Sequence, residues 1–182
     1  MGNKMFNSDY IIRGEYGEHG KFLCKEEGVN IFRRNLDLLM VAPLVGVCTG
    51  RFVKQTDISP ESKEKTFQVL LGQIDNERRN LVIIYRLVML ANPYSSASNE
   101  DKVDQALRFD SVPDSRNPNM EIFDGYVKGG IEYLYECFKN APLNSENKKE
   151  WIIDELMDFV NELRDPETAD DIDASDFGVE KY

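Results

Sequence analysis

Apolar residues recur every three or four positions over most of this chain, a spacing that predicts α-helices. The pattern is strongest over residues 36–47, where both faces are apolar, so we expect this helix to be surrounded by protein. Asn35 is its expected N-cap, and Pro43 is expected to kink or interrupt it. Later helices are predicted over residues 75–92, 98–109, 119–138 and 145–164.

Two stretches are less clearly patterned. Glycines punctuate residues 1–30, which favours loops or short strands such as Tyr10–Ile12. Ser59-Pro60-Glu61 has the form of a helix start, and the apolar residues that follow it have helical spacing. However, Phe67, Val69 and Leu71 also fall at alternate positions, so a strand remains an alternative there.

These elements predict a mainly α fold, a compact helical domain of about five or six helices over residues 1–164. Residues 1–30 form its loop-rich N-terminal segment, and a short β element is allowed for at the N-terminus or the centre. Asp165-Pro166 ends the last helix, and residues 165–182 read as a flexible acidic tail. In that last helix the residues expected to be buried are Ile152, Leu156, Phe159, Val160 and Leu163.

Gly129 and Gly130 lie in the middle of the helix predicted over residues 119–138. Two glycines there cost about 2 kcal/mol relative to alanine, so they need a structural reason. We expect a neighbouring helix to approach the backbone closely at this point.

Charge is distributed unevenly along the chain. Residues 1–116 hold equal numbers of basic and acidic residues, whereas residues 117–182 hold 6 Lys/Arg against 17 Asp/Glu and so carry the whole net charge of −11. Residues 165–182 alone hold 7 acids and 1 lysine. The acidic end of a free chain of this kind repels nucleic acid and anionic lipid.

Cysteine usage and hydropathy indicate the compartment. The three cysteines are too few and too widely spaced for a disulfide framework, and Cys48 and Cys137 are expected to be buried thiols. A reducing cytoplasm is the natural location. The longest apolar run, residues 38–47, is shorter than the ~20 residues of a membrane span.

No catalytic constellation is recognisable in the residues. His19 is the single histidine and is expected to be exposed in a glycine-rich loop. Residues 14–21 resemble a phosphate loop only in part, because Glu15 and Phe22 stand where a glycine and a hydroxyl are needed, so a plain turn is expected. We therefore predict no enzyme, no cofactor and no metal site.

Two sets of charged residues are the candidates for binding. The first set is basic and suits an anion, DNA or a protein partner: Arg33, Arg34, Arg51, Arg78, Arg79 and Arg86. For Arg86, a snorkelling or salt-bridged side chain is the simpler alternative. The second set is a partner-docking acidic group in the tail: Asp170, Asp171, Asp173 and Asp176. Their spacing does not fit a calcium-binding loop.

Three blocks of sequence, residues 31–51, 80–91 and 121–138, carry a family resemblance. The first pairs Ile31-Phe32 with an apolar helix ending in Gly46 and Gly50-Arg51, and the last contains an acidic residue, Tyr126 and the Gly129-Gly130 pair. In this order the blocks resemble the Dnd system-associated small proteins, which are encoded beside DNA phosphorothioation-dependent restriction genes of bacterial phage defence. The resemblance implies a setting, defence against foreign DNA, and supplies no catalytic residues.

These features together predict a non-enzymatic accessory protein of a prokaryotic anti-phage defence system. Its expected partner is a protein, a larger ATPase, helicase or nuclease subunit, with DNA contacted through the complex and no membrane involved. One alternative is a DNA-contacting module with an autoinhibitory acidic tail. Another is a phage-type DNA mimic.

Overall fold

The structure, a computed structural model, describes residues 5–25, 27–54, 66–93, 98–108, 119–143 and 146–164. Its elements in chain order are β1 (Tyr10–Arg13), α1 (Glu15–Cys24), α2 (Asn35–Cys48), β2 (Thr66–Val69), α3 (Leu71–Ala91), α4 (Asn99–Leu107), α5 (Asn119–Phe138) and α6 (Lys148–Arg164). The predicted fold class, mainly helical with a short β element, is confirmed.

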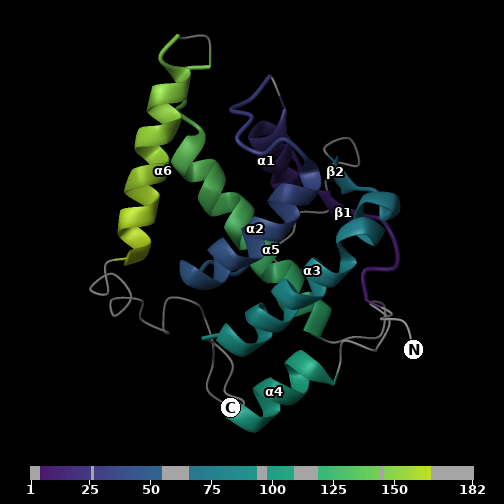
Figure 1. The fold of residues 1–182 in the computed structure, drawn as a ribbon. Coiled ribbons are helices and arrows are strands. Elements are labelled where there is room, and N and C mark those ends of the chain that lie inside the picture. The colour runs from purple at the N-terminus through teal and green to yellow at the C-terminus, as the bar shows by residue number, and fades with distance from the viewer. Residues whose placement is uncertain are drawn as a thin grey trace.

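Helix α5 lies at the centre of the molecule and contacts α1, α2, α3 and α6 (Figure 1). Its most extensive contact is with α2, which crosses it. Phe123, Tyr126 and Ile131 of α5 are fully buried, and so are Leu39 and Ala42 of α2. The α2–α5 pair is therefore the core of the domain.

Helix α2 forms where the strongest apolar pattern predicted it, with Arg34 as its N-cap in place of Asn35. It runs through Pro43 without interruption. Most of its circumference is covered, as expected of a helix that is apolar all round, but Val41 is exposed.

A two-stranded antiparallel sheet joins the N-terminus to the middle of the chain, with Ile12 opposite Phe67. The strand alternative for residues 66–69 is therefore correct and the helical prediction there is wrong. Helix α3 begins at Leu71, four residues before its predicted start. The predicted start at Ser59-Pro60-Glu61 lies outside the described residues.

Helix α1 contradicts the expectation that residues 1–30 contain only loops and short strands. Its glycines are part of the packing: the backbone of Gly20 lies so close to the Phe67 ring that a Cβ would stand 2.8 Å from it. Gly14, the N-cap, has a φ of 72°, which favours glycine. The plain turn expected over residues 14–21 is thus a cap followed by a helix that is buried on one face.

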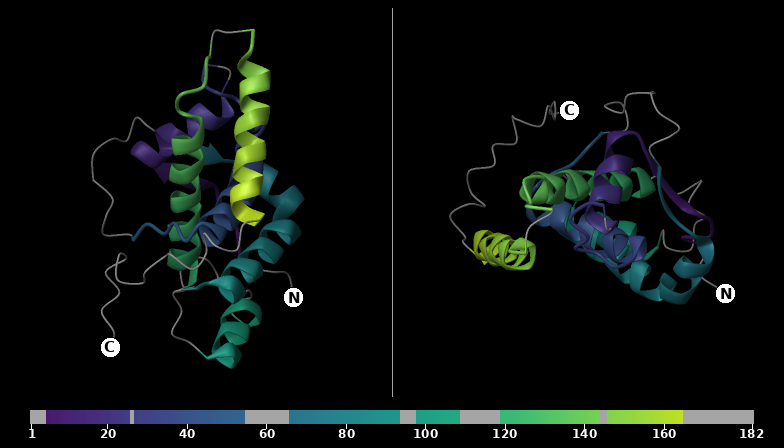
Figure 2. Two further views of the ribbon diagram at one scale, coloured as in Figure 1. Left: turned by 90° about the vertical axis from the view of Figure 1, so that its left-hand side faces the viewer. Right: turned by 90° about the horizontal axis from the view of Figure 1, so that it is seen from above.

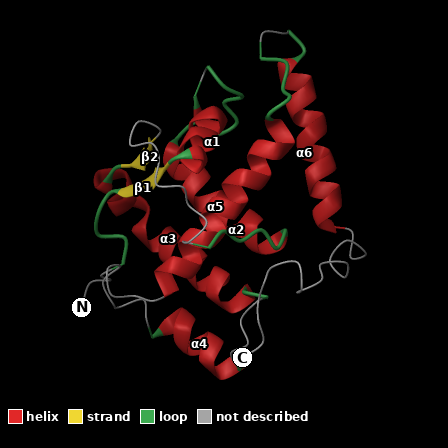
Figure 3. Cartoon of the chain, turned by 180° about the vertical axis from the view of Figure 1, so that it is seen from behind, coloured by secondary structure: helices red, strands yellow, loops and turns green. Residues whose placement is uncertain are grey.

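The last elements lie at the edges of the molecule. Helix α4 packs on α3 and starts with a capping box in which the Ser98 hydroxyl accepts a hydrogen bond from the backbone N–H of Asp101 (3.2 Å). Helix α6 lies beside α5 at the periphery (Figure 2). Figure 3 shows the sheet next to α1, on the opposite side of the molecule from α6.

Candidate interaction surfaces

Three of the candidate arginines share one face of α3. Arg78, Arg79 and Arg86 line a surface hollow of about 570 Å³, together with Asp75, Val82 and Ile83 of the same helix. Arg78 forms an ion pair with Asp75 one turn before it. Arg86, which interrupts an apolar stretch of sequence, is half-buried on the rim of this hollow.

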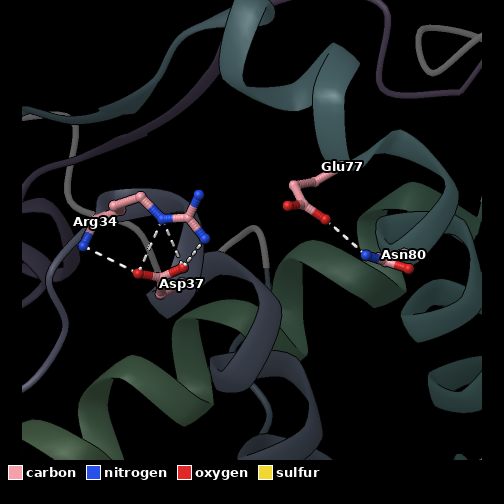
Figure 4. Close-up of polar contacts among 4 residues, drawn as sticks. All are labelled: Arg34, Asp37, Glu77 and Asn80. Carbon is pink, nitrogen blue, oxygen red and sulfur yellow. Dashed lines mark hydrogen bonds and ion pairs between the residues drawn. The ribbon is translucent and has the colours of Figure 1, made fainter.

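Arg34 lies at the start of α2 and faces α3 (Figure 4). Its Nε donates to Asp37 Oδ1 (2.9 Å), and its backbone N–H donates to the other oxygen of that carboxylate (3.1 Å). The hydrogen bond and charge of Asp37 raise the pKa of the Arg34 guanidinium, and Glu77 of α3 adds to the effect. Asp37 therefore holds the backbone and the guanidinium of Arg34 at the start of the helix, and both Arg34 and Arg33 are exposed.

Arg51 lies beyond the other end of α2, which at 14 residues is about 20 Å long. Its guanidinium approaches Glu136 of α5 (3.3 Å) and lies 5.9 Å from the centre of the Tyr133 ring. The candidate arginines thus do not form one patch. They divide into the α3 hollow, the start of α2 and the α5 side.

Gly129 and Gly130 lie where α5 meets the α2 segment. A Cβ on Gly129 would stand 2.1 Å from the carbonyl oxygen of Arg51, and a Cβ on Gly130 would stand 1.8 Å from that of Ala42. Gly46 of α2 faces α5 in the same way, because its Cβ would meet the Tyr126 carbonyl at 2.4 Å. Backbone touches backbone at this crossing.

The acidic end of the chain is presented at the edge of the molecule. On α6 the carboxylates of Glu150, Asp154 and Asp158 are exposed, and within the described ranges they form no ion pair. The four tail candidates, Asp170, Asp171, Asp173 and Asp176, lie outside the described residues. Helix α6 leads directly into this tail.

His19 is not in an exposed loop, as the sequence suggested. It is half-buried on α1 and stacks on Tyr135 of α5, with ring centres 3.7 Å apart and planes 8° from parallel. Phe22 packs edge-on against the same tyrosine ring (5.3 Å). The imidazole therefore helps to join α1 to α5.

The cysteines offer little nucleophilic chemistry in the body of the domain. Burial, and then the charge of Asp37, raises the pKa of the Cys24 thiol to about 12. Burial, and then Glu162, raises the pKa of Cys137. Cys48 is exposed, so the expectation that it is buried is wrong: it is the last residue of α2 and lies beyond the crossing with α5. The described ranges contain no group of three His, Cys, Asp or Glu side chains that could hold a metal.

Sequence reasoning missed the outer face of α6. Val160, predicted to be buried, is 37% exposed, and Ile153 and Met157 are exposed on the same face. The signal was present in the sequence: apolar residues occur in adjacent pairs at 152–153, 156–157 and 159–160. Such pairs widen the apolar arc beyond what one neighbouring helix covers.

No protein-family model, no curated protein and no solved structure gives a significant match to this chain. The resemblance to Dnd system-associated proteins therefore stays a prediction. Within the described parts of the chain, no helix has the length and apolar character needed to span a membrane.

Proposed function

We propose that this chain is a non-enzymatic interaction protein whose acidic end docks on a basic surface of a larger protein. The observation that supports this most is the placement of charge. Helix α6 lies at the periphery with Glu150, Asp154 and Asp158 exposed, and it leads into residues 165–182, which hold 7 acids and 1 lysine. Complementary charge of this kind speeds association and selects basic partners.

The sequence resemblance supplies the setting of this proposal. Small proteins of the family that it resembles are encoded beside restriction genes, so the partner is a larger ATPase, helicase or nuclease subunit of a prokaryotic anti-phage system. DNA would then be contacted through the complex. The acidic end would occupy the partner's basic channel until DNA displaces it.

The test is a binding assay with the purified full chain and the purified products of its neighbouring genes. We expect one product to bind, with an affinity that falls as salt rises. Two variants locate the site: one lacks residues 165–182, and the other has full length with the four tail aspartates changed to asparagine (Asp170, Asp171, Asp173 and Asp176). Both lose binding if tail charge is the determinant. Binding to none of the products, or binding that both variants retain in full, overturns the proposal.

A DNA-contacting module is the second candidate, and the α3 hollow favours it because Arg78, Arg79 and Arg86 converge there. In this case deletion of residues 165–182 raises affinity for DNA, with a steep salt dependence. Arg79→Glu then abolishes the gained affinity. Arg51→Glu, which reverses the charge in the same way, is the matched control, since Arg51 lies beside Glu136 on another side of the molecule. Negligible DNA binding by the shortened chain rejects this candidate.

A further inference from the structure

Helix α6 carries an exposed apolar stripe beside an acidic one. Ile153, Met157 and Val160 follow one another at i, i+4 and i+7, and their exposed fractions run from 37% to 57%. Glu150 and Asp154 lie beside this stripe on the helical surface and are also exposed. The opposite face of α6 packs on α5, so this outer face has no neighbour of comparable size in the described parts of the chain.

Helix α3 carries the counterpart. Ile83, Leu87 and Leu90 repeat the same i, i+4, i+7 spacing, with exposed fractions from 43% to 49%. Arg79 and Arg86 lie beside this stripe, so its flank is basic where that of α6 is acidic. One molecule therefore displays two apolar stripes of equal spacing and opposite charge.

The two stripes also match in their spacing along the helix and in the side on which their charged residues lie. When α3 and an α6 lie parallel with Ile83 beside Ile153, the rise per residue of a helix puts Leu87 beside Met157 and Leu90 beside Val160. Going round each helix in the direction of the chain, Arg79 and Arg86 come before the apolar stripe of α3, whereas Glu150 and Asp154 come after that of α6. In a parallel pair that brings the two stripes together, the flank before one stripe meets the flank after the other. These flanks are the basic and the acidic one.

The charged residues also fall at matching heights in this register. Arg79 comes within one residue of the level of Glu150, and Arg86 lies within two residues of the level of Asp154. An antiparallel pair would place the two charged flanks on opposite sides of the contact. The register and the charges thus favour the same orientation.

We propose that a second copy of this chain covers both stripes: α6 of each copy packs parallel on α3 of the other, in a two-fold symmetric dimer. Two-fold symmetry repeats the contact, so two helix–helix contacts form together. That matters because one such contact is small compared with the ~1,600 Å² that a standard stable interface buries. This inference does not rest on the proposed docking function.

The test is sedimentation of the full chain over about 1–200 µM at near-physiological ionic strength, where surface charges are partly screened. We expect a concentration-dependent monomer–dimer equilibrium. Met157→Glu on α6 and Leu87→Glu on α3 each raise the dimer Kd by at least roughly tenfold, because a carboxylate enters the centre of each apolar contact. Val41→Glu, at an exposed apolar position of α2, is the matched control and leaves Kd unchanged.

Mixing distinguishes this arrangement from others. A dimer of either variant alone has both contacts damaged, whereas a mixture of the Met157→Glu and Leu87→Glu proteins retains one intact contact. The mixture therefore associates more tightly than either variant by itself. Arg79→Glu and Glu150→Arg each weaken the dimer, and the double variant restores it.

Three results would overturn the inference: a monomer at every concentration, a dimer that Leu87→Glu leaves intact, or a mixture no tighter than its components. Circular dichroism of each variant establishes that it is folded. Deleting residues 165–182 leaves the dimer unchanged while removing the proposed docking segment. Failure of the dimer and failure of the docking function are therefore separate outcomes.

Discussion

The backbone of Gly130 lies against the carbonyl oxygen of Ala42, so that a Cβ on Gly130 would stand 1.8 Å from that oxygen. No Cβ atom is tolerated at such a distance from backbone, so one of the two helices has to move. The glycine pair costs helix propensity in α5, but it lets α2 and α5 approach through their backbones. This crossing holds the core of the domain.

Gly130→Ala should therefore destabilise the domain by about 3 kcal/mol or more, since overpacking against backbone cannot relax by rotating a side chain. The matched control is Gly72→Ala in α3, where a Cβ meets nothing within 4 Å. There the substitution should stabilise by up to about 1 kcal/mol, because alanine favours a helix over glycine. Urea unfolding measures both, and equal effects of the two substitutions would contradict this account of the crossing.

Tyr126→Phe tests the buried hydrogen bond that joins α5 to the end of α3. The Tyr126 hydroxyl donates to Asn92 Oδ1 (2.7 Å), and both residues are buried. Removing the hydroxyl deprives the Asn92 oxygen of that donor, at a cost of about 1–2 kcal/mol in unfolding free energy. Tyr133→Phe is the matched control: its hydroxyl donates to Glu162 (2.9 Å) in an exposed setting, and we expect a change of at most about 0.5 kcal/mol.

Local patterns predicted most of the helices but not the elements that depend on distant partners. The 3.6-residue period located α5 and most of α3, because each buries one long stripe, and a long run of apolar residues located α2. Residues 66–69 satisfy both periods, and pairing with β1, more than 50 residues earlier, makes them a strand. In α1 the glycines looked like turn residues, yet Gly20 is where the Phe67 ring packs.

The candidate site was predictable only in part, for the same reason. Composition identified the arginines and the acidic end as the charged groups of interest. It could not show that Arg34 is held by Asp37 or that Arg51 lies beside Glu136, because these arrangements depend on where helix ends fall. The outer face of α6 was hidden because Phe159 and Val160, which are adjacent, were both expected to face the core, whereas Val160 is exposed.

Thiol labelling should separate the three cysteines. Cys48 is exposed, whereas burial raises the pKa of Cys24 to about 12 and also raises that of Cys137. Since the thiolate is the reacting form, iodoacetamide at about pH 8 should modify Cys48 first. Mass spectrometry should find one modified thiol in the folded chain and three in urea. Rapid labelling of Cys24 in the folded protein would contradict the packing of α1 on α2.

Glu132 should make the domain less stable as pH rises through the carboxyl range. Its pKa is raised by burial first and then by Glu136, with Arg51 acting in the opposite direction. A carboxyl group with a folded pKa above its unfolded one binds its proton more tightly in the folded state. The unfolding free energy therefore falls as pH rises from the unfolded pKa through the folded one.

Glu132→Gln removes this penalty, so the Tm of the variant should exceed that of the unsubstituted protein at about pH 7. The difference in Tm should vanish near pH 3, where the carboxyl is protonated in both the folded and the unfolded state. Asp158→Asn, at an exposed position of α6, is the control for exchanging a carboxylate for an amide. A Tm difference independent of pH would assign the effect of Glu132→Gln to packing instead of ionisation.

Helix α6 should separate from the body before the rest of the domain unfolds. None of its described side chains is fully buried, and within the described parts of the chain its ring contacts are with α5: Trp151 packs on Phe138 and Phe159 on Tyr133. Elements with so few buried contacts open at lower free energy than the global transition. Trp151 is the single tryptophan, so its fluorescence reports this docking directly.

Unfolding is followed in urea at about 1 µM protein, which limits self-association. The transition seen by Trp151 fluorescence should have a lower midpoint and a shallower slope than the transition seen by far-UV circular dichroism, because the dichroism is sensitive to every helix. Phe159→Ala should lower the fluorescence midpoint further and leave the main dichroism transition in place, because it removes a contact of α6 alone. Ile152→Ala, on the same half-buried face, should act in the same direction. Coincident transitions in all three proteins would show instead that α6 unfolds as one cooperative unit with the α2–α5 core.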